Sequence, residues 1–452
     1  MLGGMGNVVK LQPSPNGRTT GRPGAGPRRI RANARTGSRN GSMATAGPAR
    51  KRGRRRSDKT ALVLGGGGFT GGVYEIGALR ALDLLAVNST VNQFDIYVGT
   101  SAGAFVAALC ANGVTPEEMM QVLLREGPSP FEDVDLGDLL HLNVPQMIRR
   151  GAQLPWRVLG LARQAVRQRG QISAMDVVLG LAEGLPSGLY TGAGIESYLH
   201  RVLSEPGRSD KFDELRRELY LTATDLDTCE RVVFGEDGYR DVPISTAVRA
   251  SGALPMVYAP VEVDGRELVD GGLISTTNLD IAVQAGAKLV VVINPIVPFV
   301  NDFSETVRTL EGVRARRVSD MGFPQIGYQA FKLLAHQRLH ELAARWEDRY
   351  PGVDIVLIEP EPADKLMFET SMLHFASRVE IARHGFESVT QHLAGEYERY
   401  RVVAERHGLD ISGERLARVV EHFDEIETSQ SAWRRILEET TGALLRQAGL
   451  AG

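Results

Sequence analysis

Cysteine is scarce in this 452-residue chain, and long hydrophobic runs are missing. The two cysteines, Cys110 and Cys229, lie far apart in apolar or strand-like sequence, so we expect neither a disulfide framework nor a metal set, and a reducing, cytoplasmic setting. No window of about eighteen consecutive apolar residues occurs, so no membrane-spanning helix is predicted. A secretory signal is also lacking. No cluster of potential ligands indicates a metal, and no cofactor is expected.

Charge is unevenly distributed along the chain. The formal net charge is -3, yet residues 1–58 carry fourteen Lys or Arg side chains and only one acid, Asp58. This segment is rich in Gly, Pro, Ser and Arg and poor in large apolar residues, so burial cannot repay the entropy cost of ordering it. We therefore predict a disordered basic tail over residues 1–58.

The basic run of the tail, residues 49–56, admits two interpretations. It could bind an anionic lipid surface or a nucleic acid through charge. The simpler interpretation, which we favour, is a solvated tail, or a gene start extended upstream of a true start at Met43. The density of Gly and Pro speaks against the amphipathic helix of a transit peptide. We expect no nucleic-acid partner, and the sequence leaves the oligomeric state open.

From residue 59 onward, strand-like and helix-like runs alternate. This order predicts an α/β fold, a three-layer sandwich with a largely parallel central sheet, over residues 59–300. A helical insertion interrupts it at about 115–203. Residues 301–452 are predicted to be a mainly helical C-terminal extension, because apolar residues recur there at helical spacing, with one strand at 352–360.

A glycine-rich stretch, GGGGFTGG, follows the first strand at residues 65–72. Gly66, Gly68 and Gly71 satisfy the spacing G-x-G-x-x-G of a phosphate-binding turn. No Gly-Lys-Ser/Thr follows, which excludes a Walker-type loop, and the second strand ends in Gly-Thr-Ser instead of the acid that a dinucleotide fold needs. Bare backbone can equally direct N–H groups at one point, as an oxyanion hole requires.

The second strand leads into GTSAG, a G-x-S-x-G directly between a strand and an Ala-rich helix. In this context Gly99 and Gly103 allow a sharp turn that exposes Ser101 at a helix N-terminus, as in a nucleophile elbow. A serine that merely caps the helix is the structural alternative. Among the acidic residues, Asp270 has the sequence context that best suits a catalytic role. It ends an apolar run and precedes two glycines, and it could equally cap its own turn.

Together these three features resemble the patatin-like phospholipase family. GGGGFTG looks like its glycine-rich oxyanion loop, GTSAG like its nucleophile elbow, and the DGG at 270–272 like its catalytic aspartate motif. The segments 247–261 and 223–235 are similar to family segments that lie before that aspartate. The resemblance covers about residues 60–300.

The resemblance implies a Ser–Asp dyad that hydrolyses lipid acyl esters, as a phospholipase A or lysophospholipase does. Ser101 would attack the ester carbonyl, Asp270 would take its proton directly, and an acyl-enzyme would then react with water. The implied oxyanion donors are backbone N–H groups of the glycine loop. The candidate loop glycines are Gly66, Gly67, Gly68 and Gly71.

Two departures from the family pattern leave alternatives open. The family usually has Arg or Lys where this chain has Thr70, and one extra residue follows Gly71. After the aspartate the family often has Asn and Pro, where this chain has Ser275 and Asn278. A catalytically silent lipid-binding protein is one alternative. The other is an α/β-hydrolase esterase with a Ser–Asp–His triad, which would need a C-terminal histidine such as His336 or His374.

The helical insertion offers a clue to partners. Residues 139–175 combine Trp156 and other apolar residues with six arginines and no acid. The arginines are Arg149, Arg150, Arg157, Arg163, Arg167 and Arg169. Such a basic amphipathic stretch suits an anionic membrane surface, and equally a lid helix with solvated arginines. We therefore expect a cytoplasmic enzyme with peripheral membrane contact through 139–175 and the basic tail.

Overall fold

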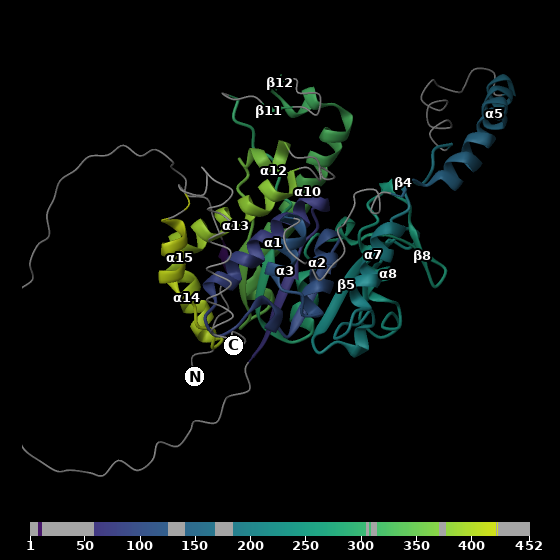
Figure 1. Cartoon of the computed structure of the whole chain (residues 1–452). Coiled ribbons are helices and arrows are strands. Elements are labelled where there is room, and N and C mark those ends of the chain that lie inside the picture. The colour runs from purple at the N-terminus through teal and green to yellow at the C-terminus, as the bar shows by residue number, and fades with distance from the viewer. Residues whose placement is uncertain are drawn as a thin grey trace, which may run out of the picture. The chain divides into compact units, whose positions relative to one another are not determined.

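A computed structural model describes residues 8–10, 58–124, 141–167, 184–303, 307–308, 314–369, 377–421 and 423. These residues belong to one compact unit around a nine-stranded sheet (Figure 1). The predicted α/β fold with a largely parallel central sheet is confirmed.

The sheet has the strand order β1-β13-β10-β2-β3-β5-β9-β8, with β6 paired to β5. All neighbours from β1 to β5 are parallel, whereas β6, β8 and β9 pair antiparallel. Its strands are β1 (Val8–Lys10), β2 (Lys59–Leu64), β3 (Ile96–Thr100), β5 (Glu218–Asp225), β6 (Arg231–Phe234), β8 (Val261–Val263), β9 (Arg266–Asp270), β10 (Ala287–Ile293) and β13 (Asp354–Ile358). Two small pairs stand apart, β4 (Gly188–Tyr190) with β7 (Met256–Tyr258) and β11 (Val307–Arg308) with β12 (Arg314–Ala315).

Helices connect and cover the strands. They are α1 (Gly68–Leu85), α2 (Ala102–Ala111), α3 (Pro116–Leu124), α5 (Val144–Arg167), α7 (Ala193–Leu203), α8 (Ile244–Ser251), α9 (Leu279–Gln284), α10 (Phe323–Ala344), α11 (Trp346–Arg349), α12 (Lys365–Glu369), α13 (Arg378–Gly395), α14 (Tyr397–Arg406) and α15 (Gly413–Val420). Short 3-10 turns lie at Val91–Gln93, Phe212–Glu214, Gly271–Leu273 and Val318–Met321.

The central strands bury both of their faces, which makes three layers. In β2, Leu62 and Leu64 belong to one core with helices α1, α2 and α13, while Ala61 and Val63 belong to a second core with α9 and α10. Successive side chains of a strand point to opposite faces, so a continuous apolar run fills both cores. This explains why β2, β3 and β10 read as unbroken hydrophobic segments.

The sheet continues past the boundary expected at residue 300. Strand β13 lies between β10 and β1. Helix α13 packs along α1 (Figure 1). Trp346, at the start of α11, is fully buried in the second core. The C-terminal region is thus mainly helical, as expected, but it completes the central sheet.

Three residues of the expected tail are ordered. Val8–Lys10 forms β1, which pairs in parallel with the outer edge of β13, so the prediction of disorder is wrong there. Two β-branched residues and an open strand edge favour this pairing. Apart from Asp58, the remainder of the tail, including residues 49–56, lies outside the described residues.

Of the expected insertion, the structure describes α3, α5, β4 and α7, so the described part of the segment is mostly helical and holds one short strand. Residues 125–140 and 168–183 lie outside the described residues. Among the helices described, none has the length and apolar character needed to cross a membrane.

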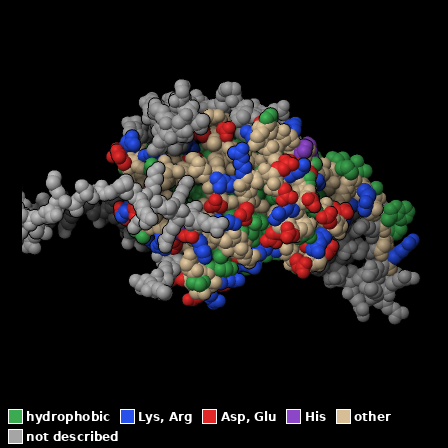
Figure 2. All heavy atoms as spheres, turned by 90° about the horizontal axis from the view of Figure 1, so that it is seen from below, with side chains coloured by type: hydrophobic (Ala, Val, Ile, Leu, Met, Phe, Trp, Pro, Cys, Tyr) green, Lys and Arg blue, Asp and Glu red, His purple; other side chains and the backbone are tan. Residues whose placement is uncertain are grey.

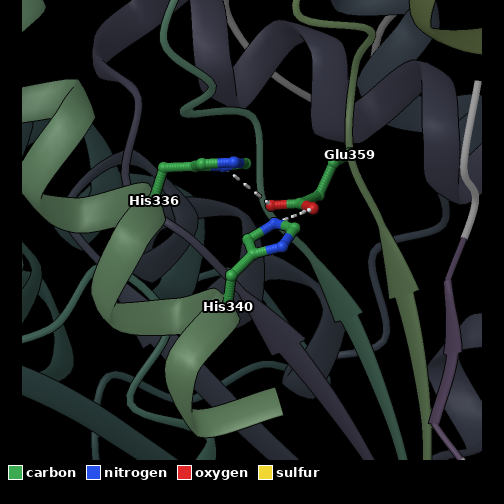
Figure 3. A group of neighbouring side chains, drawn as sticks. All are labelled: His336, His340 and Glu359. Atoms are coloured by element: carbon green, nitrogen blue, oxygen red, sulfur yellow. Dashed lines mark hydrogen bonds and ion pairs between the residues drawn. The ribbon is translucent and has the colours of Figure 1, made fainter. Parts of the chain in front are cut away.

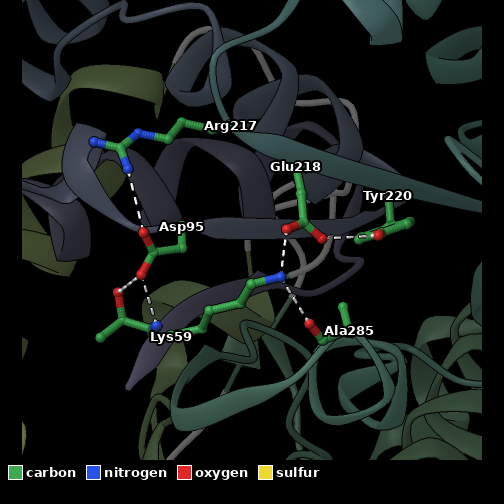
Figure 4. Close-up of polar contacts among 7 residues, drawn as sticks. Lys59, Asp95, Arg217, Glu218, Tyr220 and Ala285 are labelled. Atoms are coloured by element: carbon green, nitrogen blue, oxygen red, sulfur yellow. Dashed lines mark hydrogen bonds and ion pairs between the residues drawn. The ribbon is translucent and has the colours of Figure 1, made fainter. Parts of the chain in front are cut away.

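Polar contacts gather at the amino ends of the parallel strands, opposite to the candidate site. Lys59 Nζ lies 2.5 Å from Glu218 Oε1 and 3.0 Å from the carbonyl oxygen of Ala285, and Arg217 reaches Asp95 at 3.3 Å (Figure 4). These groups are part-exposed, so we assign them a modest contribution to stability. On the face shown in Figure 2, acidic and basic side chains are interspersed.

Candidate active site

Ser101 lies at the turn between β3 and α2. Its backbone has φ 57° and ψ -124°, a conformation that non-glycine residues rarely adopt and that costs of order 1–3 kcal/mol. The backbone N–H of Ser101 donates to Ser251 Oγ at 2.8 Å, which helps to hold this turn. The strain places the side chain outside the sheet, at the carboxyl end of β3.

The two glycines of the elbow allow a close approach of backbone to backbone. A Cβ atom on Gly99 would lie 2.5 Å from Ala104 Cα, and one on Gly103 would lie 2.4 Å from the carbonyl oxygens of Leu64 and Gly65. Real Cβ atoms essentially never come so close. The two glycines of G-x-S-x-G are therefore required by the packing of this turn.

Asp270 ends β9, 169 positions after Ser101 in the sequence, and the structure brings the two side chains together. Ser101 Oγ donates to Asp270 Oδ2 at 2.5 Å, and Asp270 Oδ1 accepts the N–H of Gly272 at 2.8 Å. Both carboxylate oxygens thus have a donor. The aspartate does cap its own turn, and it reaches the serine as well.

The register of β5 explains this meeting. Residues 218–222 of β5 pair with β3, and its last three residues extend beyond the end of β3 at Thr100. Strand β9 runs antiparallel along this overhang, and Asp270 is opposite Ala223. The end of β9 therefore comes down to the level of the nucleophile elbow.

Burial changes the acidity of the aspartate. Asp270 is 3% exposed, and burial raises its pKa from 3.8 to about 6, although the hydrogen bonds from Ser101 and Gly272 act in the opposite direction. A carboxylate with a raised pKa is a stronger base toward a serine hydroxyl.

The glycine loop lies next to the serine. A Cβ atom on Gly66 would be 3.3 Å from Ser101 Cβ, and one on Gly67 would be 2.8 Å from Gly71 Cα and 2.9 Å from Pro295 Cγ. Gly68 has φ +62° and begins α1, whose positive dipole end faces this loop. Side chains are thus kept away from the approach to Ser101.

The four loop glycines differ in the partners of their N–H groups. Gly66 donates to the carbonyl oxygen of Thr276 at 3.0 Å, and Gly71 donates to Gly67 O at 3.0 Å. The N–H groups of Gly67 and Gly68 have no protein acceptor among the described residues. Of the four candidates, only these two can donate to an oxyanion without losing an existing bond.

A cavity of about 250 Å³ opens beside Ser101 and Asp270. Most residues that line it are apolar and come from α1, α2, α3, α7, α8, β7 and α10. They include Val73, Ile76, Phe105, Leu109, Met119, Leu123, Ile195, Tyr198, Val248, Val257 and Phe331. No histidine is among the described residues that line this cavity. His336 lies elsewhere on α10, and His374 lies outside the described residues.

Sequence reasoning missed the role of Asn278. Its side chain is fully buried, and Nδ2 lies 3.0 Å from the hydroxyls of both Thr100 and Thr222, while Oδ1 accepts from Arg231 at 3.1 Å. Asn278, directly before α9, therefore ties this helix to the end of β3 and to the middle of β5. The family pattern had pointed to this turn, but only the fold shows which strands the asparagine joins.

A second group was also missed. His336 and His340 on α10 converge with Glu359, which follows β13. The spacing of four residues between the two histidines was a visible signal, but the glutamate could not be assigned to them without the fold.

The comparisons agree with the motifs. Residues 62–283 match the family model described as patatin-like phospholipase. A probable lipid hydrolase of Invertebrate iridescent virus 6 is 23% identical over 229 residues, 49% of this chain and 63% of that protein. The human patatin-like phospholipase domain-containing protein 6 is 28% identical over 236 residues, 52% of this chain and 13% of that protein. This chain therefore spans less than two thirds of the length of either relative.

Among solved structures, VipD from Legionella pneumophila is similar, with a TM-score of 0.33 and 16% identity, covering 75% of this chain and 67% of that chain. The sequence match and its relatives bear out the resemblance drawn from the glycine loop, the elbow and the Asp-Gly-Gly turn. Residues 62–283 of this chain form a patatin-like phospholipase domain.

Proposed function

We propose that the chain is a serine acyl hydrolase that cleaves lipid acyl esters with Ser101 and Asp270. The observation that carries the proposal is the direct contact of Ser101 Oγ with Asp270 Oδ2 at 2.5 Å, at the edge of an apolar cavity. The family match and the lipid hydrolase among the relatives support the choice of substrate class.

The dyad acts first by proton transfer. Asp270 accepts the Ser101 proton while Oγ attacks the ester carbonyl carbon. When the tetrahedral intermediate collapses, the protonated carboxyl returns that proton to the leaving alcohol oxygen, and an acyl group remains on Ser101. Asp270 then takes a proton from the water that attacks the acyl-enzyme, and the protonated carboxyl gives this proton to Ser101 Oγ as the fatty acid leaves.

The oxyanion of each tetrahedral intermediate is stabilised by the N–H groups of Gly67 and Gly68 and by the N-terminus of α1. Removing one such donor from comparable sites costs about 2.7–4 kcal/mol of transition-state stabilisation. Thr70 is buried in the first turn of α1, so the loop presents backbone in place of the basic side chain usual in the family.

The cavity would hold the acyl chain. Side chains such as Val73, Phe105 and Tyr198 offer it apolar surface, and burial of a chain there is favourable by about 0.8 kcal/mol per CH₂ group. We assign the substrate to phospholipids or lysophospholipids, whose ester carbonyl could reach Ser101 while the headgroup stays outside.

Helix α5 would bring the enzyme to a bilayer. Ile148 and Trp156 are 67% and 74% exposed. Leu159, three residues after Trp156 and thus on a neighbouring part of the helix surface, is also exposed. Arg149 and Arg163 are exposed on this helix. Apolar side chains flanked by arginines suit an anionic lipid surface, and we propose peripheral binding there.

The test uses the wild type, Ser101→Ala, Asp270→Asn and a His336→Ala/His374→Ala double variant of the full chain. Fatty-acid release from mixed-lipid vesicles reports activity, and covalent labelling by a fluorophosphonate reports a reactive serine without any assumption about the lipid. We expect release and labelling for the wild type and the histidine variant, and neither for Ser101→Ala or Asp270→Asn.

Other results would favour the alternatives. Labelling that survives Asp270→Asn but is lost in the histidine variant would favour a Ser–Asp–His triad. A wild type that releases no fatty acid and is not labelled would favour a silent lipid-binding protein. Labelling without release from any vesicle would leave the nucleophile intact and refute the choice of substrate.

A further inference from the structure

Two histidines and a glutamate converge away from the cavity, at the carboxyl end of β13. His340 Nε2 lies 2.8 Å from Glu359 Oε2, and His336 Nδ1 lies 3.9 Å from Glu359 Oε1 (Figure 3). The two imidazole rings are 3.9 Å apart between centroids. All three side chains thus present nitrogen or oxygen atoms to one small volume.

The backbone holds these side chains in place. Residues four apart in a helix lie on one face, so α10 presents His336 and His340 side by side. Glu359 comes directly after β13, and its Oε1 accepts from Asn294 Nδ2 at 2.8 Å. Asn294 is itself buried and bonded through its N–H to Ile358 O at 2.9 Å. A carboxylate oriented by a fixed outer partner is typical of metal ligands.

The distances suit a small metal ion. Zinc binds imidazole nitrogen and carboxylate oxygen at about 2.0–2.2 Å, so neighbouring ligand atoms in a tetrahedral site are about 3.3 Å apart. The separations are 2.8 Å from His340 Nε2 to Glu359 Oε2 and 3.9 Å from His336 Nδ1 to Glu359 Oε1, on either side of this value. One ligand atom from each of the three residues lies within 4.8 Å of the others. Shifts within the reach of side-chain rotation would close the site.

The donors also select the metal. Two imidazoles and one carboxylate suit zinc and similar transition metals, whereas calcium and magnesium prefer oxygen ligands alone. His336 and His340 are 26% and 33% exposed, so an ion can reach them from solvent. No other three His, Cys, Asp or Glu side chains converge in this way within the described part of the chain.

We propose that His336, His340 and Glu359 bind one divalent transition-metal ion of the zinc class, with water as the fourth ligand. The position that holds the general base in an H-E-x-x-H metalloprotease is Gln337 here, and its Nε2 donates to Glu341 at 3.3 Å. An amide cannot act as that base, so we assign the ion a role in holding the structure and not in catalysis.

The ion would tie α10 to the sheet. Tyr328 and Phe331, on the same helix, line the acyl cavity, and Asn294 precedes Pro295, which packs against Gly67. Metal binding would thus stabilise α10 against the sheet without supplying a group to the reaction, so hydrolysis is expected to continue without the ion. This role does not depend on the hydrolase proposal, because binding can be measured without any substrate.

The experiment uses the full chain without an affinity tag, stripped with a chelator and titrated with Zn²⁺ by calorimetry, and the metal content is measured after buffer exchange. The matched variants are His340→Gln and Glu359→Gln. His200→Gln is the control, because His200 pairs with Asp210 at 2.7 Å but belongs to no group of three potential ligands among the described residues. Circular dichroism checks that each variant is folded.

For the wild type and His200→Gln we expect about one Zn²⁺ per chain and a rise in melting temperature on binding. For the two site variants we expect the affinity for Zn²⁺ to fall by about 100-fold, since one of three protein ligands is lost. If both site variants fail to fold, Co²⁺ added to the stripped wild type decides the matter, since a site with these donors gives visible absorption. Zinc content far below one per chain, or equal affinity in all four proteins, would overturn the proposal.

Discussion

Replacing Asp270 by Asn should stabilise the folded protein while it removes activity. The carboxyl is buried, and burial raises its pKa from 3.8 to about 6. Since the folded state holds the proton more tightly than the unfolded state, the group's contribution to stability is fully present below pH 3.8 and is lost as the pH rises through about 6.

The magnitude follows from the size of this shift. Two pKa units correspond to about 3 kcal/mol, so above pH 7 the ionised carboxylate lowers the free energy of unfolding by roughly that amount. Asparagine has the same shape, carries no charge, and its Oδ1 can still accept the N–H of Gly272. At pH 7.5 we therefore expect Asp270→Asn to gain up to about 3 kcal/mol, and at pH 4 to gain little.

Asp83 provides a matched control. It is also buried, its Oδ1 accepts the N–H of Val91 at 2.7 Å, and burial raises its pKa to about 6, but it does not line the cavity. Asp83→Asn should show a stability gain with the same pH dependence and keep the wild-type rate. The two variants together separate the cost of a buried charge from its use in catalysis.

Urea unfolding is monitored by circular dichroism at pH 4, 6 and 7.5, and the hydrolysis of a soluble ester is measured over the same pH range. The wild-type rate should fall about tenfold per pH unit below pH 6, because only the ionised carboxylate accepts the serine proton. If Asp270→Asn were no more stable than wild type at pH 7.5 while Asp83→Asn gained, or if it kept wild-type turnover, the reasoning would be refuted.

Three other changes test the packing of the site. Gly103→Ala would place Cβ 2.4 Å from two carbonyl oxygens, so we expect a loss of at least about 3 kcal/mol in urea unfolding, whereas Gly395→Ala meets no atom within 4 Å and should be neutral or stabilising. An equal effect of both would contradict the close packing. Gly66→Ala brings Cβ within 3.3 Å of Ser101 Cβ, so we expect a folded protein whose fluorophosphonate labelling slows at least tenfold; unchanged labelling would argue against the assigned approach to the serine. Asn278→Ala leaves two threonine hydroxyls and a guanidinium without their buried partner and should cost about 2–4 kcal/mol, and a thermal melt within 1 °C of wild type would show that the asparagine is dispensable.

Local motifs predicted the turns that the structure brings together at the cavity, because each motif lies within a few residues of a strand end. The turn at Ser101 needs only the flanking glycines and the strand and helix beside it, and all of these are contiguous in the sequence. The fold class followed in the same way from alternating strand and helix patterns. Both predictions rest on short-range features, which one sequence displays directly.

Features that depend on distant partners could not be predicted. The N–H of Gly66 is taken by the carbonyl of Thr276, which lies 210 positions later in the chain, so the sequence alone could not exclude Gly66 as an oxyanion donor. Asn278 and Glu359 owe their roles to strands that meet only in the sheet. Strand β1 could not be predicted from residues 8–10 alone, because it pairs with the open edge of β13, more than 340 positions later in the chain.

The meeting of Ser101 and Asp270 depends on a single property of β5, which is its length. Because β5 extends three residues beyond β3, an antiparallel strand can pair with that overhang and end level with the elbow. If β9 were parallel to β5, the chain would run away from the elbow after Asp270. Because β9 is antiparallel, the chain runs toward the elbow, and the Gly271–Gly272 turn ends the strand where Asp270 Oδ2 faces Ser101 Oγ. A direct contact of carboxylate with serine, without an intervening imidazole, is therefore a consequence of sheet register as much as of the two residues themselves.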